Sequence, residues 1–103
     1  MATDYPYPCK LLNGAEVLDG SCRCTFRQLS RRTPLGGEFS GEGSIRLSTP
    51  WPFTLRAKEP QAFTLRFERL VIPGVGELGD LPILLVPAEA FGSTTVSFKI
   101  GTA

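Results

Sequence analysis

The sequence predicts an all-β fold, either a single-domain antiparallel β-sandwich or a small β-barrel of about seven to nine short strands with at most one short helical turn. Three observations favour this class. Eleven glycines and nine prolines separate short apolar runs along the 103 residues. Turn signals recur about every eight to twelve residues, and several runs alternate apolar and polar side chains, as strands with one buried face do. A chain of this length can bury one core without metals or disulfide bonds.

The N-terminus is expected to form an extended arm over residues 1–8, because Tyr5 and Tyr7 each precede a proline and this pairing disfavours helix. Residues 9–103 are expected to form the single all-β domain. The first residues lack a basic start followed by an apolar run, and no segment reaches the roughly 18 apolar residues of a membrane-spanning helix. These features predict a cytoplasmic protein with no membrane partner.

Two turn signals follow each other in the first part of the domain. Asn13-Gly14 and Asp19-Gly20 both have the composition of a two-residue hairpin turn. A turn at Asp19-Gly20 is favoured, because it places Glu16 opposite Arg23 across the strands. The next strand, over residues 21–29, alternates its faces and is expected to bury Cys22, Cys24 and Phe26.

The centre of the chain is predicted to contain a long loop and a hairpin. Residues 31–43 hold four glycines and one proline, which indicates a loop. A strand over residues 44–48 leads to a hairpin whose loop is at residues 59–61. The hairpin register pairs Leu55 with Leu65 and brings the apolar side chains of the two strands opposite each other.

The last third of the chain supplies the remaining elements. Alternation fails over residues 69–72, which predicts a β-bulge near Glu68. Residues 81–87 are apolar throughout, so a strand buried on both faces is expected. Residues 87–92 begin with proline and end with glycine, which favours one helical turn. The final strand, over residues 94–100, is expected to place on one face Val96, Phe98 and Ile100.

Arginines recur every ten residues in the middle of the chain, at Arg46, Arg56 and Arg66. Period-two alternation places them on one face of the strands and their apolar neighbours on the other. Residues 22–69 contain nine Lys or Arg and four Asp or Glu, although the net charge of the chain is +1. Arginine favours bidentate and stacked contacts. The stripe is therefore either a binding face or an ordinary solvated sheet face.

Residues 74–79 match the nucleotide-binding spacing G-x-G-x-x-G. That motif needs a helix starting at its end, and Pro82 and Pro87 leave no room for one. A turn-rich loop is expected instead.

Cys9, Cys22 and Cys24 offer three soft ligands where zinc normally requires four, and the chain has no histidine. Buried thiols that pack as small apolar groups are favoured over a metal site, and no cofactor is predicted. The absence of histidine also removes the commonest general base. Glu38 and Glu42 remain as carboxylate candidates, and the chain is expected not to be an enzyme.

Arg27 and Arg31 have the spacing R-x-x-x-R, and residues 40–43 have S-x-x-G. These fragments resemble the signature of the PilZ barrels, a family that binds cyclic dinucleotides. The chain departs from that pattern at Glu38 and in the short gap between the two fragments, so it is not assigned to the family. The arginines beside the glycine-rich loop are still chemically suited to bind phosphate. The alternative is that they are ordinary solvated surface arginines.

Two functions remain open. The first is protein recognition or self-association, with a homodimer as one form, through Tyr5, Tyr7, Trp51, Arg46, Arg56 and Arg66. The alternative is binding of a nucleotide, cyclic dinucleotide or nucleic acid through Arg27, Arg31, Arg32, Arg46, Arg56 and Arg66. Trp51, which lies between two prolines, is either a rigid aromatic anchor at the surface or a cap on the open end of the core.

Overall fold

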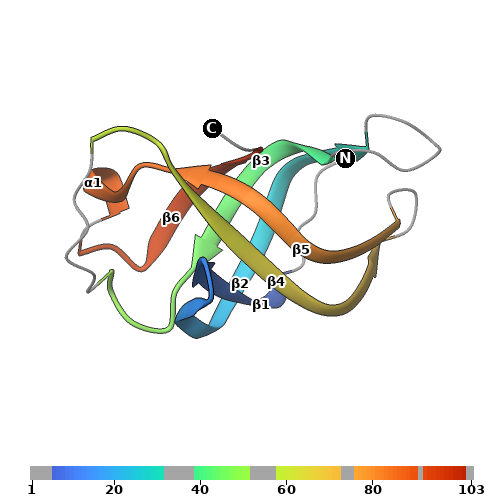
Figure 1. Ribbon diagram of the computed structural model, residues 1–103, viewed down its shortest axis with the longest axis horizontal. Helices are drawn as coiled ribbons and strands as arrows, with labels where there is room; N and C mark the ends of the chain where they lie inside the picture. The colour runs from blue at the N-terminus through green and yellow to red at the C-terminus, as the bar shows by residue number, and fades with distance from the viewer. Residues whose placement is uncertain (1–5, 32–38, 52–57, 73–75, 91, 102–103) are drawn as a thin grey trace.

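The computed structural model describes residues 6–31, 39–51, 58–72, 76–90 and 92–101. Within these residues the chain forms a closed antiparallel β-barrel (Figure 1). Its elements are β1 (Tyr7–Asn13), β2 (Glu16–Arg31), β3 (Phe39–Arg46), β4 (Gln61–Ile72), β5 (Gly76–Leu85), α1 (Pro87–Ala90) and β6 (Thr95–Ile100). The predicted all-β class is confirmed, and the barrel is the correct one of the two predicted architectures.

The strand order around the barrel is β1-β2-β3-β6-β5-β4, and β4 closes the sheet by pairing with β1. Strands β1, β2 and β3 follow one another as antiparallel neighbours, whereas β4 is reached by a longer connection that returns to the side of β1. The spatial order 4-1-2-3 is that of a Greek key. Figure 1 shows β4 and β5 side by side as one long hairpin across the barrel.

The first hairpin turns at Gly14–Ala15, so the turn predicted at Asp19-Gly20 is wrong. Gly14 has a φ of 62°, a left-handed conformation that glycine adopts without steric cost. Arg23 pairs with Pro8 and not with Glu16. The observed register buries the apolar side chains of β1, and that gain outweighs one cross-strand charge pair. Tyr7 and Pro8 also belong to the barrel wall and not to an N-terminal arm.

Asp19 lies inside β2, at a β-bulge. Cys9 pairs with Cys22 and Leu11 with Asp19. One residue of β1, Lys10, therefore lies opposite two residues of β2, namely Gly20 and Ser21. The residues Asp19-Gly20, which were predicted to form a hairpin turn, therefore form part of a β-bulge.

The carboxylate of Asp19 connects this bulge to the chain that follows β3. It accepts hydrogen bonds from the amide of Ser21 (2.8 Å), the amide of Ser48 (3.0 Å) and the hydroxyl of Ser48 (3.0 and 3.1 Å). Asp19 is the one buried charged residue in the described part of the chain, with 7% exposure. A carboxylate this buried is stable only where hydrogen bonds replace its lost water.

Both ends of the loop predicted over residues 31–43 are strand, because β2 continues to Arg31 and β3 begins at Phe39, and residues 32–38 lie outside the described residues. A side chain at Gly43 would collide with the carbonyl oxygen of Thr25, and one at Gly41 with that of Gln28. These glycines let β3 approach β2 beside a second bulge, at Arg27. Two of the four glycines that indicated a loop, Gly41 and Gly43, thus allow close contact between two backbones.

The β-bulge predicted near Glu68 is confirmed by a register shift between Arg66 and Leu70. Leu55, the predicted partner of Leu65, lies outside the described residues, and both edges of β4 at Leu65 are taken by other strands. Leu65 pairs with Leu11 of β1 on one edge and with Leu81 of β5 on the other. The matching apolar patterns led to a partner close in sequence, whereas β4 pairs with β1 on one edge and with β5 on the other.

Strand β5 runs from Gly76 to Leu85, so no helix follows the G-x-G-x-x-G spacing. The predicted burial of residues 81–87 on both faces is also wrong. Leu81, Ile83 and Leu85 are buried, whereas Pro82 is exposed and Leu84 is half-buried. The strand has one core face, like its neighbours.

Inward side chains from all six strands fill the barrel with one hydrophobic core. At its centre the ring of Phe26 contacts the rings of Phe67 and Phe98, with centroid distances of 6.0 and 6.2 Å. Val96 and Phe98 of β6 are buried as predicted. The short helix that begins at Pro87 confirms the predicted helical turn. No helix among the described residues has the length and apolar character that crossing a membrane requires.

Trp51 closes one end of this core. Its ring is 2% exposed and meets Phe63 edge to face at 6.0 Å. Its main chain exchanges hydrogen bonds with residues beyond α1, from the Trp51 amide to Ser93 (2.9 Å) and from the Gly92 amide to Trp51 (3.4 Å). Of the two interpretations of Trp51, the structure agrees with the cap.

Replacing Gly43 with alanine should lower the free energy of unfolding by about 1–3 kcal/mol, because the added methyl group meets a backbone oxygen that cannot move cheaply. The matched control is Gly79→Ala in β5, where an added Cβ has no atom within 4 Å. That control should change stability by no more than about 0.5 kcal/mol. Urea unfolding measures both, and equal stabilities for the two variants would contradict the close approach of β2 and β3.

Replacing Asp19 with alanine should cost roughly 1–3 kcal/mol, since the amides of Ser21 and Ser48 lose their acceptor in a partly buried position. Asp80→Ala, at an exposed carboxylate of β5, is the control and should have a smaller effect. Thermal unfolding followed by circular dichroism compares the two variants. An Asp19→Ala protein as stable as the control would show that the bulge needs no such connection.

Candidate functional site

The barrel wall is open between β1 and β4. These strands pair at Lys10 with Arg66, Leu11 with Leu65 and Leu12 with Thr64. Among the described residues no pairing with β4 extends over the rest of β1 toward Tyr7. Because the bulge of β4 begins directly after Arg66, the two strands separate at this point.

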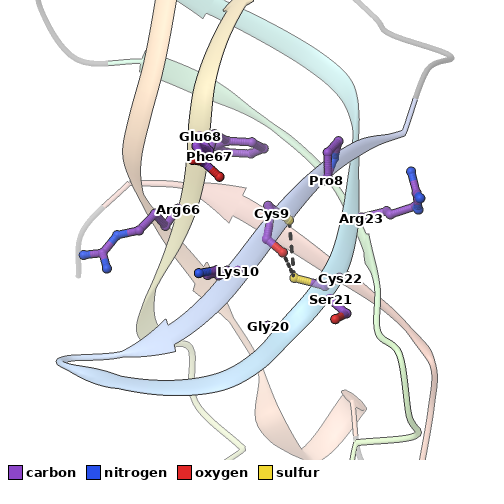
Figure 2. Close-up of a pocket in the computed structure, with 10 residues that line it drawn as sticks. All are labelled: Pro8, Cys9, Lys10, Gly20, Ser21, Cys22, Arg23, Arg66, Phe67 and Glu68. Atoms are coloured by element: carbon purple, nitrogen blue, oxygen red, sulfur yellow. Dashed lines mark hydrogen bonds between the residues drawn. The ribbon is translucent and has the colours of Figure 1, made fainter.

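A hollow of about 800 Å³ lies at this opening (Figure 2). Strands β1, β2 and β4 line it with Pro8, Cys9, Lys10, Gly20, Ser21, Cys22, Arg23, Arg66, Phe67 and Glu68. The lining includes buried core residues such as Cys9 and Phe67 as well as exposed ones such as Lys10. The hollow therefore reaches between the strands and does not merely rest on their outer surface.

Four cations of neighbouring strands surround the hollow or lie beside it. The register places Arg46 of β3 opposite Arg23 of β2, and Lys10 of β1 opposite Arg66 of β4. All four side chains are exposed, and we call them the basic belt. Like charges directly opposite each other on adjacent strands destabilise a sheet. The belt thus concentrates positive charge at a small cost to the fold.

One member of the basic belt is engaged by a carboxylate. The guanidinium of Arg66 donates two hydrogen bonds to Asp80 of β5, at 2.9 and 3.2 Å. Hydrogen bonding and charge from Arg66 hold the pKa of Asp80 below its ordinary value, and the same contact raises the pKa of Arg66. Within the described residues, Lys10, Arg23 and Arg46 form no ion pair with a carboxylate.

Thiols form the floor of the hollow. The Cys9 and Cys22 sulfurs are 3.3 Å apart, and the Cys22 thiol donates a hydrogen bond to the Cys9 carbonyl at 3.0 Å (Figure 2). The hydrogen bond with Cys22 and burial raise the pKa of Cys9, and burial raises the pKa of Cys24. Cys9 and Cys24 are therefore neutral thiols near neutral pH. No group of three or more His, Cys, Asp or Glu suited to a metal occurs in the part of the chain that is described.

The residues of the two binding sites predicted from the sequence lie in different parts of the structure. Arg46 and Arg66 belong to the basic belt, whereas Arg27 lies 3.9 Å from Glu42 and lines a second hollow of about 330 Å³ near β5 and β6. Arg31 is the last residue of β2. Tyr5, Arg32, Glu38 and Arg56 lie outside the described residues. Tyr7 is half-buried in β1, with its ring 6.4 Å from that of Phe26.

Two members of the basic belt were absent from the sites predicted from sequence, Lys10 and Arg23. Each lies at a polar position between buried residues of an alternating strand, so its outward direction follows from the sequence. The residue that each cation lies opposite does not follow from the sequence. Lys10, for example, lies opposite Arg66 because β1 pairs with a strand more than fifty residues away in the sequence. Alternation identifies outward cations, but only the topology brings them together.

Comparison with known proteins finds no family model that matches the chain, no similar curated protein and no similar solved structure. The fold and the basic belt are therefore the basis for any functional proposal.

Replacing Arg66 with glutamine should raise the pKa of Asp80 toward the ordinary value of an aspartate, because the hydrogen bonds that favour its charged form are lost. In the wild type this contact contributes stability above the pH at which Asp80 titrates, and the contribution is lost as the pH falls through the lowered pKa. Arg46→Gln, on a strand that does not adjoin β5, should leave the Asp80 titration unchanged. Carboxyl-carbon NMR titration measures these values. An Asp80 pKa that does not respond to Arg66→Gln would contradict the ion pair.

Proposed function

We propose that this protein is a non-catalytic binding domain for a small ligand that carries phosphate groups, held by the basic belt at the hollow between β1 and β4. The observation that carries the proposal is the register, which sets Arg46 beside Arg23 and Lys10 beside Arg66. Selection for stability alone disfavours two like-charged pairs on neighbouring strands. A bound anion would convert both pairs into favourable contacts.

The chemistry of the lining suits phosphate. Arginine presents a planar set of donors that matches phosphate oxygens, and lysine acts as a compact point charge. Arg23 and Lys10 line the hollow together with the exposed Ser21, whose hydroxyl is a further donor. Glu68 is the one acidic residue in the lining.

The size of the site favours a small molecule over a nucleic acid. A volume of about 800 Å³ lies within the range of about 300–1,000 Å³ found for ligand pockets. The two cation pairs are centred two strand spacings apart, which corresponds to roughly 10 Å across the sheet. The site thus suits a ligand with two separated anionic groups, such as a nucleotide with a phosphate chain or a cyclic dinucleotide.

Protein recognition or self-association has weaker support. One of the residues predicted to carry it, Trp51, is buried in the core and is not available as a surface anchor. The large hydrophobic residues that are exposed in the described part of the chain, Val17 and Val71, lie at the ends of β2 and β4 and not beside Trp51. Catalysis has weaker support still, because the chain has no histidine and Glu42 faces Arg27.

Titration calorimetry with ATP, cyclic di-GMP and a short single-stranded DNA tests the proposal. Binding of one of the first two should weaken with added salt and should fall by roughly 1.5–3 kcal/mol in Arg23→Gln or Lys10→Gln, since each variant removes a charged hydrogen-bond donor. Both variants should unfold at the same temperature as the wild type or higher, because a like-charge contact is relieved.

Arg27→Gln is the matched control, because Arg27 is an exposed arginine of the same strand that lines the other hollow. Its affinity for the ligand should equal that of the wild type. Equal losses in Arg23→Gln and Arg27→Gln would indicate a diffuse charge effect and not a site. Binding of the DNA alone would favour a nucleic-acid interface, and no binding of any probe would remove the proposal's support.

A further inference from the structure

The thiols of Cys9 and Cys22 face each other across two strands. The two residues pair directly in the β1–β2 register, and their sulfurs are 3.3 Å apart. Directly opposed residues of antiparallel strands have Cα atoms about 4.5 or 5.5 Å apart, and both values fall within the range of about 4.4–6.8 Å that a disulfide bond requires. A bond between these sulfurs therefore needs side-chain rotation and little movement of the backbone.

The pair is buried and lies against the hollow. Cys9 and Cys22 both line the hollow, and Figure 2 shows their sulfurs between Lys10 and Arg23. Cys9 retains 6% exposure, whereas Cys22 has 1% and Cys24 has none. The cations around the opening favour the approach of anionic reagents, and oxidised glutathione is such a disulfide because its carboxylates outnumber its amino groups.

The third cysteine cannot take part in the same way. Cys24 pairs with Tyr7 across the strands and so has no thiol opposite it. Its distance from Cys22 along β2 is two residues, or roughly 6.6 Å between Cα atoms, with the two side chains parallel. Cys24 is thus the odd cysteine of the chain and a natural control.

We propose that Cys9 and Cys22 are a site of reversible disulfide formation by exchange with a low-molecular-weight disulfide. The thiolate of one cysteine attacks a sulfur of oxidised glutathione, which forms a mixed disulfide and releases one glutathione. The second thiol then attacks the protein sulfur, loses its proton and releases a second glutathione. The protein loses two hydrogen atoms and the glutathione disulfide is reduced to two thiols. The bond would join β1 to β2 beside the bulge, and the inference does not depend on the proposed ligand.

Trypsin separates the three cysteines, which makes the test direct. Cleavage after Lys10, Arg23 and Arg27 places Cys9 in residues 1–10, Cys22 in residues 11–23 and Cys24 in residues 24–27. The folded protein is incubated with oxidised glutathione in mildly alkaline buffer, where thiolate is more abundant. We expect an intact mass lower by two hydrogen atoms and a linked pair of peptides 1–10 and 11–23, both reversed by dithiothreitol.

Single cysteine-to-serine variants distinguish a specific Cys9–Cys22 disulfide bond from adventitious oxidation. Cys24→Ser should form the bond as the wild type does, whereas Cys9→Ser and Cys22→Ser should not. The oxidised wild type should also unfold at a higher temperature than the reduced protein, because the bond constrains the unfolded chain. A link that includes residues 24–27, a stable glutathione adduct without closure, or oxidation only after unfolding in guanidinium would each overturn the proposal.

Discussion

The closure of the sheet through three residue pairs is the constraint on which the rest of this structure depends. Lys10, Leu11 and Leu12 of β1 meet Arg66, Leu65 and Thr64 of β4, and this contact converts a six-stranded sheet into a barrel with one interior. It pairs the edges of β1 and β4 over these residues, which shortens the exposed edge that each strand would otherwise present. It also sets the side of the barrel on which the wall is incomplete, because the strands separate directly beyond Lys10.

The bulges adapt the strands to this closure. The described strand pairs contain four register shifts, two of them between β1 and β2. Each of the three bulges considered above adds residues to one strand of a pair, which bends that strand and changes which side chains face inward. The bulge opposite Lys10 is supported by the carboxylate of Asp19, the bulge at Arg27 by glycines of β3, and the bulge after Arg66 begins at the open part of the wall. Two of the three therefore border the hollow. Two of these irregularities thus lie beside the opening between β1 and β4, where the basic side chains Lys10, Arg23 and Arg66 line the hollow.

The sequence predicted what depends on neighbouring residues and missed what depends on distant ones. Alternation correctly assigned the faces of Cys22, Phe26, Val96 and Phe98, and its failure near Glu68 correctly indicated a bulge. The hairpin at Leu55 and Leu65 failed because several strands carry the same apolar pattern, so the pattern cannot identify the partner. Asp19-Gly20 was taken for a turn because turns and bulges use the same residue types. The basic belt could not be predicted, since it exists only through pairings between β3 and β2 and between β1 and β4.

The chain contains a single tryptophan, and its position gives the molecule an internal optical reporter. Trp51 is buried against Phe63 and does not line the hollow. An indole in such apolar surroundings emits at shorter wavelengths than one in water, so its fluorescence follows the integrity of the core at that end of the barrel. Events at the hollow that leave the core intact will be silent in this signal. Tryptophan emission therefore distinguishes loss of the fold from a change confined to the wall between β1 and β4.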